Sequence, residues 1–352
     1  MHRFILAALL ATACASAPSG DYASAIEAST ATMRALVEKD RIPGAAIAVT
    51  MGDRSVWHDT FGVTDLASAV GVRAETRFRV GSVTKMLTAA ALLRLADQQR
   101  LRLDDPVRTT LPDFPHGEIT LRQLAGHLGG IRHYSGSEFL NHEHFPNARS
   151  SLTRFANDPL LSKPGEKYTY STYGYNILGA VIEQVTGKDF DDAMRELVTG
   201  PLKMTETTFA RDAVTTTLYD NSKEGPVVAP AVDLTDRLPA GAAVTTARDL
   251  ARFLAAMSGD RFLSAASRAA IATPQQTLEG KPISVGVGWR VATDGKGRTF
   301  LHHGGAVTGG RAMVLFYPRE RVGVVILTNL GFATFNEKQA GAIAEAFVDS
   351  DQ

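Results

Sequence analysis

Strand-like segments lie near both ends of this 352-residue chain, and helix-like segments fill the long stretch between them. Near the N-terminal end, residues 45–50 and 55–58 read as two strands joined by a turn at 51–54. Near the C-terminal end, strands are expected at 285–291, 299–302, 313–317 and 322–327. The sequence therefore predicts an α+β fold, with one antiparallel sheet built from the N- and C-terminal segments and a helical subdomain packed against it.

The same pattern predicts where the parts of the chain begin and end. Helices are expected at 22–38 and about 335–347, flanking the sheet. The sheet subdomain should comprise about 21–81 and 282–352, and the helical subdomain about 82–281, where Pro and Gly interrupt the helices. Residues 21–352 contain no internal repeat or low-complexity linker, so we expect them to form one domain.

Residues 1–20 have the features of a secretory signal peptide, which predicts export. A short basic start precedes an apolar stretch at 4–11, which is too short to span a bilayer as a mature helix. Cys14 is the only cysteine, so a disulfide within the chain and a cysteine metal site are excluded. Residues 11–14 partly resemble a lipoprotein cleavage box. A periplasmic protein and a lipoprotein anchored to the membrane through Cys14 therefore both remain open.

The charges are balanced, with 37 Lys and Arg residues and 37 Asp and Glu residues, giving a formal net charge of zero. No basic run alternates with aromatic residues, so nothing predicts a nucleic-acid partner. We expect the partner to be a small molecule or a fragment of a larger polymer.

The most specific chemical signal is a serine three residues before a lysine at the start of a predicted helix. Ser82 and Lys85 follow Gly81, and residues 86–96 are strong helix formers without Pro or Gly. Positions i and i+3 share one helix face, so the lysine amine can reach the serine hydroxyl. The partial positive charge of a helix N-terminus favours a neutral lysine and an oxyanion. Such a pair is an activated nucleophile, although a serine here otherwise serves as an N-cap.

Two further segments carry polar side chains next to predicted secondary structure. In residues 168–179 several hydroxyls precede an apolar helix, and a tyrosine there either relays a proton or caps the core. In residues 302–310 two histidines precede small residues, whose backbone N–H groups can hold an oxyanion. Adjacent strand residues point to opposite faces, so His302 and His303 are not expected to bind one metal ion. The sequence predicts no metal and no organic cofactor.

Taken in order, these segments resemble the serine β-lactamase-like family. That family includes class C β-lactamases, D-alanyl-D-alanine carboxypeptidases, related esterases and the LACTB-type proteins. The resemblance covers about residues 25–345 and rests on FRVGSVTK at 78, LRQLAGHLGGIRHY at 121, PGEKYTYSTYGYNILG at 164, AAVTTARDLARF at 242 and HHGGAVTGG at 302. It implies a β-lactamase/transpeptidase-like fold and an acyl-enzyme mechanism.

The resemblance also implies roles for particular residues. It assigns the nucleophile to Ser82, its base to Lys85 and the proton relay to Tyr170. The oxyanion hole would be the N–H groups of Ser82 and Ala306. The third family motif falls on His303, Gly304 and Gly305, with a one-residue shift to His302 as the alternative.

Two departures from the family pattern affect substrate binding. Thr172 stands where the family has asparagine, and His303 stands where strong β-lactamases have lysine. A neutral histidine holds a carboxylate less well than an ammonium does, so Arg311 is a candidate for supplying the charge. We therefore expect an exported serine hydrolase acting on a β-lactam, a D-alanyl peptide or peptidoglycan fragment, or a small ester. The alternative is a catalytically weak or inactive binding or scaffolding protein on the same fold.

Overall fold

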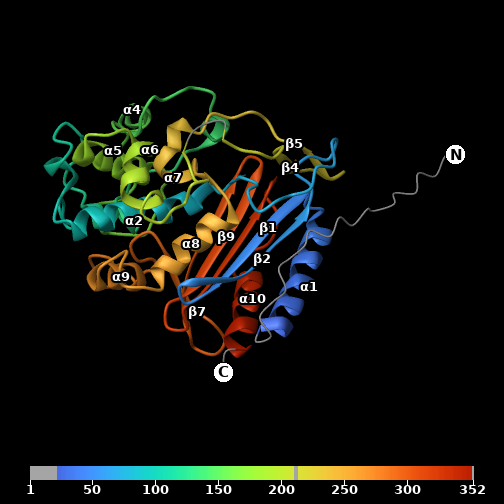
Figure 1. The fold of residues 1–352 in the computed structure, drawn as a ribbon. Coiled ribbons are helices and arrows are strands. Elements are labelled where there is room, and N and C mark those ends of the chain that lie inside the picture. Colours follow the sequence, from blue (N-terminus) through green and yellow to red (C-terminus); the bar gives the residue numbers. More distant parts are fainter. Residues whose placement is uncertain (1–21, 210–212, 351–352) are drawn as a thin grey trace.

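Six antiparallel strands form the central sheet of the computed structural model, which describes residues 22–209 and 213–350 (Figure 1). Across the sheet the strands run in the order β2-β1-β10-β9-β8-β7. They comprise β1 (Gly44–Met51), β2 (Arg54–Gly62), β7 (Arg290–Thr293), β8 (Thr299–Val307), β9 (Gly310–Tyr317) and β10 (Val322–Thr328). Strand β1 pairs with β10, from Ala45 opposite Thr328 to Met51 opposite Val322. The prediction that distant segments complete one antiparallel sheet is confirmed.

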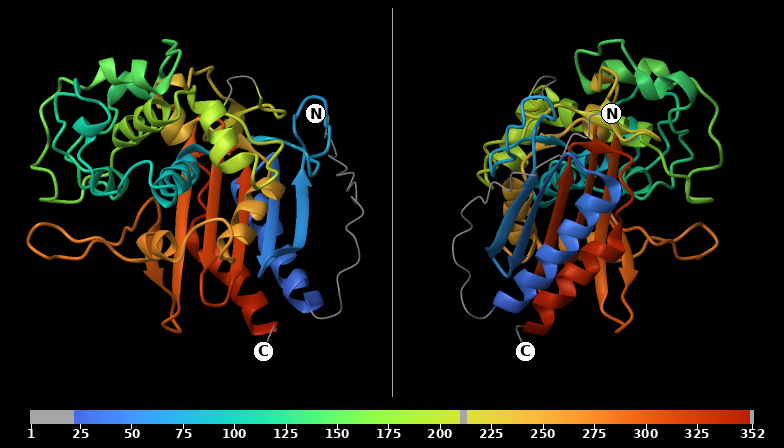
Figure 2. Two further views of the ribbon diagram at one scale, coloured as in Figure 1. Left: turned by 60° about the vertical axis from the view of Figure 1, so that its left-hand side comes forward. Right: turned by 90° about the vertical axis from the view of Figure 1, so that its right-hand side faces the viewer.

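Two helices from the ends of the chain cover one face of the sheet. Helix α1 (Ala23–Asp40) and helix α10 (Glu337–Ser350) lie side by side there (Figure 2). They bury a second apolar core against that face, with Met33 and Phe347 among its members. The ring of Phe347 stacks on that of Trp57 from β2, with 6.2 Å between their centroids. The termini of the fold are therefore packed against its central sheet.

The opposite face of the sheet carries helix α8 (Ala247–Met257) and, beyond it, the helical subdomain (Figure 1). The other helices are α2 (Thr84–Asp97), α3 (Leu121–Ala125), α4 (Ala148–Ser151), α5 (Tyr173–Thr186), α6 (Phe190–Met194), α7 (Leu238–Gly241) and α9 (Ala265–Ala272). In the described part of the chain, two small sheets lie outside the main one. One is formed by β3 (Phe78–Arg79) with β6 (Val244–Thr245), and the other by β4 (Tyr219–Asn221), β5 (Pro226–Val228) and β11 (Leu330–Gly331).

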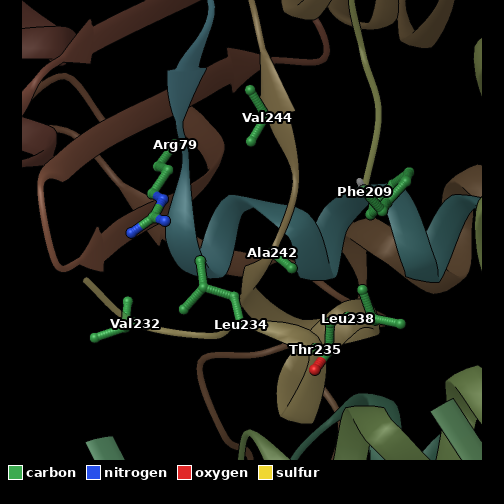
Figure 3. A pocket seen from close by; sticks show the side chains of 8 residues that line it. All are labelled: Arg79, Phe209, Val232, Leu234, Thr235, Leu238, Ala242 and Val244. Atoms are coloured by element: carbon green, nitrogen blue, oxygen red, sulfur yellow. The ribbon is translucent and has the colours of Figure 1, made fainter. Parts of the chain in front are cut away.

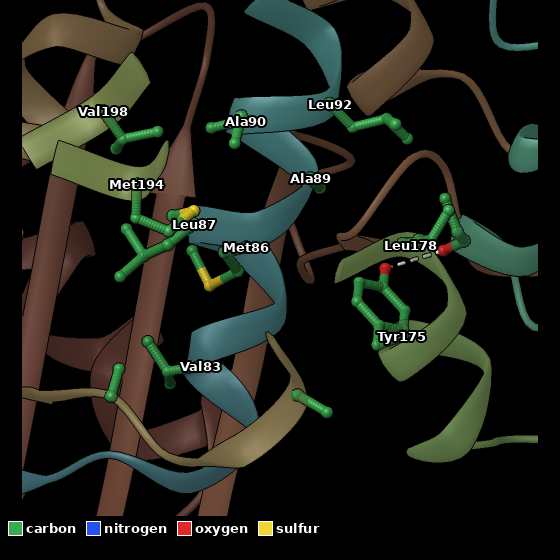
Figure 4. Packing of buried hydrophobic residues seen from close by; sticks show 14 of the residues in the cluster. Val83, Met86, Leu87, Ala89, Ala90, Leu92, Tyr175, Leu178, Met194 and Val198 are labelled. Carbon is green, nitrogen blue, oxygen red and sulfur yellow. Dashed lines mark hydrogen bonds between the residues drawn. The ribbon is translucent and has the colours of Figure 1, made fainter. Parts of the chain in front are cut away.

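Helix α2 is buried on nearly all sides and forms the centre of the helical subdomain. Its apolar residues contact α5 and α6 as well as the loops around them (Figure 4). Residues Met86 and Leu87 are fully buried, and so is Leu92 further along the helix. A helix that is apolar all round belongs in a core. This packing fixes the start of α2 relative to the sheet, and Ser82 lies at that start.

The strand expected at 285–291 is wrong over most of its length, because β7 begins only at Arg290. The chain bends before it at Gly288, whose φ of +80° is open mainly to glycine. A Cβ on Gly288 would lie 2.2 Å from the Cβ of Ala89, so the backbone passes directly under α2. Val287 and Trp289 are buried in the helical core instead of pairing in the sheet. Alternation of apolar residues did not distinguish this bend from a strand.

Among the described residues, no helix is both long enough and apolar enough to cross a membrane. The predicted signal peptide and Cys14 lie outside the described residues.

Candidate active site

Ser82 lies in a single 3₁₀ turn, Gly81–Val83, that leads directly into α2. Gly81 has a φ of +51°, and a Cβ on it would come within 2.9 Å of the backbone nitrogen of Ala306. Only glycine allows the two chain segments to approach so closely. The turn therefore holds Ser82 directly against strand β8.

Three of the predicted residues meet at the Ser82 hydroxyl. The Tyr170 hydroxyl donates to Ser82 Oγ at 2.8 Å, and Lys85 Nζ lies 3.2 Å from the same oxygen. Tyr170 comes from the loop before α5, 88 residues further along the chain. The structure thus brings a serine, an amine and a phenol to hydrogen-bonding distance, which is the geometry of an activated nucleophile.

The environment of Lys85 favours the neutral amine. The side chain is fully buried, and burial, reinforced by the positive charges of Arg237 and Arg290, holds its pKa well below the usual value. Lys85 Nζ donates to the carbonyl oxygen of Ala240 at 2.8 Å and lies 3.3 Å from Thr172 Oγ1. A neutral amine that donates its two hydrogens to these two oxygens has its lone pair free to accept the proton of Ser82.

Two histidines hold the loop that carries Tyr170. His127 Nδ1 accepts the N–H of Ser171 at 3.2 Å, and His133 Nδ1 accepts the N–H of Thr172 at 3.1 Å. Both rings also contact the Tyr170 ring, at centroid distances of 4.5 Å and 5.4 Å. Burial lowers the pKa of His133 to about 4 and that of His127 well below its usual value. These neutral rings position the loop without placing an acid beside Ser82.

Burial also determines which form of Tyr170 is present. It raises the pKa of the phenol, while the hydrogen bond to Ser82 and the charge of Arg290 act in the opposite direction. The environment therefore favours the neutral phenol over the phenolate. Lys85 is then the group suited to accept a proton, and Tyr170 is suited to pass one on.

Strand β8 presents His303 to this site and His302 to the other face of the sheet. His303 is buried, and burial, reinforced by the positive charge of Arg290, lowers its pKa to about 3. Its Nδ1 lies 2.8 Å from the carbonyl oxygen of Gly304, so the neutral ring carries its hydrogen there. His302 instead contacts the ring of Phe300 in the other core. The choice between the two histidines, which the sequence left open, favours His303.

Backbone contacts bring Ala306 next to Ser82. A Cβ on Gly305 would lie 1.8 Å from the carbonyl oxygen of Val80 and 3.2 Å from the nitrogen of Ser82, so this position requires glycine. Arg79 donates to the carbonyl oxygen of Thr308 at 3.2 Å and ties the end of β8 to the strand that precedes Ser82. Figure 3 shows Arg79 beside Leu234, in a mostly apolar pocket next to the start of α2. The two N–H groups expected to form an oxyanion hole therefore belong to segments that are fixed to each other.

Arg311 does not lie at this site, so its prediction as the carboxylate anchor is wrong. Its guanidinium donates to the carbonyl oxygen of Phe335 at 2.9 Å and lies over the Phe335 ring. Arg311 pairs with Ala306 across the sheet, and side chains of paired residues lie on one face, here the face of α10. Gly304 likewise faces Met313 on that side, and only its backbone adjoins the site. The closeness of Arg311 to Ala306 in the sequence did not show on which face of the sheet its side chain lies.

Strand β7 leaves part of β8 open at the edge of the sheet. It pairs with Thr299 to His302 only, with Arg290 opposite His302. Beyond that point, no described strand covers the outer edge of residues 303–307. An open edge next to a nucleophile can take an extended substrate by backbone hydrogen bonding.

Arg290 is a charged residue near Ser82 that was not predicted from the sequence. Arg290 Cζ lies 5.8 Å from the centroid of the Tyr170 ring, and the residue lines a small recess with His127, Tyr168 and His303. Its signal was a single charge at the end of an otherwise apolar run, 285–289. Within residues 22–209 and 213–350, no group of three or more His, Cys, Asp or Glu side chains is arranged to hold a metal ion.

Comparisons with known proteins agree with this geometry. A family model described as "Beta-lactamase" matches residues 30–347. The chain is 26% identical to the serine beta-lactamase-like protein LACTB of Homo sapiens, over 67% of this chain and 57% of that protein. It is also 26% identical to penicillin-binding protein 4* of Bacillus subtilis, over 84% of this chain and 69% of that protein. A solved D-stereospecific amidohydrolase from Streptomyces superposes with a TM-score of 0.75 at 26% identity, over 90% and 98% of the two chains. The chain thus spans little more than half the length of LACTB.

Proposed function

The chain belongs to the Beta-lactamase family, and from that premise we propose that it is a serine hydrolase that works through an acyl-enzyme on Ser82. The observation that carries this proposal is the contact of Ser82 Oγ with both Lys85 Nζ and the Tyr170 hydroxyl, at 3.2 Å and 2.8 Å. The depressed pKa of Lys85 supports its role as the base.

In the first step Ser82 Oγ forms a bond to the substrate carbonyl carbon as its proton moves to Lys85. The N–H groups of Ser82 and Ala306 stabilise the resulting oxyanion. The bond to the leaving group then breaks, and Tyr170 passes the proton to the departing atom. Water attacks the acyl-enzyme next, its hydroxyl completes the acid product, and its remaining proton returns to Ser82 Oγ. No step consumes a cofactor.

The substrate class we propose is an acyl compound with an ester, peptide or lactam carbonyl. Thr172 supports this breadth. Its hydroxyl keeps the polar contact to Lys85, but it lacks the amide with which the family's asparagine would also bind the substrate. His303 supports it as well, because a neutral imidazole offers no ionic anchor at the position where strong β-lactamases have a lysine.

The test is a screen of the purified protein against nitrocefin, a nitrophenyl acetate ester and a D-alanyl-D-alanine peptide, with Ser82→Ala as the control. We expect at least one substrate to turn over and the control to be inactive. Mass spectrometry after treatment with a fluorophosphonate should locate the adduct on the Ser82 peptide. An unlabelled Ser82 would instead favour the second candidate, a binding or scaffolding protein.

We further propose that the protein is exported, which rests on the sequence of residues 1–20. Fractionation of cells that express the full chain, alongside a Cys14→Ser variant, separates a cleaved periplasmic protein from a lipid-anchored one. Retention in the cytosol at full length would contradict export.

A further inference from the structure

A cleft beside the end of α8 lies well away from Ser82. Its walls are the β1–β2 turn, the β9–β10 turn, helix α2, the end of α8 and the loop that follows α8. The volume of the cleft is about 490 Å³, which is within the range of small-molecule sites. Arg94 of α2 lines the cleft, and it lies roughly 18 Å from Ser82 along the helix axis. The cleft is therefore separate from the candidate active site.

Three arginines from distant parts of the chain line this cleft. They are Arg94, Arg261 in the loop after α8, and Arg321 in the β9–β10 turn. Among the described residues, no carboxylate oxygen lies within 4.0 Å of any of their nitrogen atoms. Their positive charges are therefore available to a bound anion.

Arg94 is already held in place on one side. Its Nη1 donates to the carbonyl oxygen of Phe262 at 2.9 Å, and its Cζ lies 5.5 Å from the centroid of the Phe262 ring. Its Nε is buried without an acceptor in the described part of the chain. The charge of Arg94 acts on Asp97, but that carboxylate already accepts hydrogen bonds from Ser264 and Ser267. A guanidinium that is fixed and short of acceptors is suited to bind an anion.

Arg321 belongs to the opposite subdomain and reaches the cleft from the sheet. A Cβ on Gly52 would lie 3.5 Å from Arg321 Nη2, so the guanidinium lies over the backbone of the β1–β2 turn. Both turns line the cleft. Guanidinium groups from the sheet and from the helical subdomain therefore meet at one cleft.

Two aspartates limit what the cleft can bind. Asp53 and Asp260 also line it, and both are exposed, so the charged side chains of the lining leave a small positive excess. The end of α8 adds little to this balance, because its last carbonyl oxygens accept from the N–H groups of Ser258 and Gly259. A small excess does not attract anions of every kind, so binding depends on how the guanidinium groups are arranged.

That arrangement favours a phosphate group over a carboxylate. The two oxygens of a carboxylate lie in one plane and are matched by a single guanidinium. A phosphate has three acceptor oxygens that point in different directions, so it can bind guanidinium groups on different walls. Pro201, Leu202 and Phe262 offer an apolar surface in the same cleft for the body of a phosphate ester.

We propose that this cleft binds a phosphate group, as inorganic phosphate or as a small phosphate monoester, through Arg94, Arg261 and Arg321. The site goes beyond the proposed hydrolase function and does not depend on it. Its ligand would lie against the sheet and the helical subdomain at once.

Isothermal titration calorimetry of the purified protein at pH 8 and constant ionic strength tests the proposal. The probes are inorganic phosphate and phenyl phosphate, and benzoate is the carboxylate control with the same ring. We expect saturable binding of one phosphate group per chain, with a Kd on the order of 1 mM. Benzoate should bind at least about tenfold more weakly. Tighter binding of phenyl phosphate would assign the site to an ester, and equal or tighter binding of inorganic phosphate would assign it to the free ion.

Variants locate the bound phosphate. Arg321→Gln and Arg261→Gln each remove one exposed guanidinium and should weaken binding roughly 10- to 100-fold. Asp260→Asn should tighten binding several-fold, because it removes a negative charge from the lining. Arg34→Gln is the matched control, because that arginine is exposed on α1 at the other face of the sheet and should leave the Kd within about twofold. Ser82→Ala should bind phosphate like the wild-type protein.

Four results would overturn the proposal. They are no saturable binding of either phosphate probe, benzoate binding as tight as that of phenyl phosphate, an equal loss of affinity in Arg34→Gln, and weaker binding in Asp260→Asn. Loss of phosphate binding in Ser82→Ala would move the phosphate to the active site and would likewise contradict it. None of these outcomes bears on whether Ser82 forms an acyl-enzyme.

Discussion

Replacing Lys85 by methionine should change how the stability of the protein depends on pH. Lys85 is fully buried, and no carboxylate is among the charges that act on it. A base for Ser82 must be neutral in the folded protein at pH 7. In the unfolded chain the same side chain holds its proton up to a pH of about 10.4. Unfolding of the wild-type protein should therefore take up one proton at this residue between pH 7 and 9, and unfolding of Lys85→Met should not.

The magnitude follows from that one proton. When the unfolded state binds one more proton than the folded state, the free energy of unfolding rises by about 1.4 kcal/mol per pH unit. The wild-type protein should therefore gain about 2.7 kcal/mol relative to Lys85→Met between pH 7 and pH 9. The lost hydrogen bond to the Ala240 carbonyl costs the variant about 1–3 kcal/mol at both pH values, so it cancels in the comparison.

Urea unfolding at the two pH values measures this difference. Trp57 and Trp289 are both buried and report unfolding by fluorescence. Lys338→Met on α10 is the matched control, because that side chain is exposed and its charge lies in water in both states. A stability difference between wild type and Lys85→Met that stays constant with pH would refute the reasoning. Lys85 would then carry a proton in the folded protein and could not act as the base for Ser82.

Three further predictions concern the same site. Tyr170→Phe should lower kcat/KM by roughly 10²–10⁴, the usual range for a proton-transfer group, and an unchanged rate of Ser82 labelling would exclude the relay. His303→Lys should raise the rate of acylation by benzylpenicillin more than that by nitrophenyl acetate, because it adds a cation where the imidazole has a pKa of about 3; equal changes would contradict this. The same depressed pKa means that the unfolded state takes up a proton at His303 as the pH falls below about 6.5, so stability is lost from there down to about pH 3. Between pH 7 and 5 this should cost about 2 kcal/mol, and His303→Asn should lose that much less stability in urea unfolding; equal losses would show that His303 is not buried as a neutral ring.

Much of the fold was predictable because it depends on local patterns. The turn at 51–54 and the flanking apolar runs predicted the β1–β2 pair, and the apolar run after Ser82 predicted α2. Spacing also brought Lys85 within reach of Ser82, since one helical turn fixes that distance. The motifs in their order identified the family. Each of these features is carried by neighbours in the sequence.

Contacts between distant segments of the chain could not be predicted from local sequence patterns. Which histidine faces Ser82 depends on the register of β8 against β9, and a shift of one residue would exchange His302 and His303. Arg311 was assigned to the wrong face for the same reason. The prediction of a strand at 285–291 was wrong because the close approach of Gly288 to Ala89 is a tertiary contact, which the local sequence does not show.

The sequence by itself determined the reactive groups, and the tertiary structure decided their charge and their direction. Ser82, Lys85 and Tyr170 are evident from motifs, but the neutral state of Lys85 comes from burial and from two arginines 152 and 205 residues further along the chain. Arg290 reaches the site because it is the first residue of β7 and pairs with His302, one residue before the open edge of β8. Electrostatic effects act through space, so only the folded chain brings these charges together.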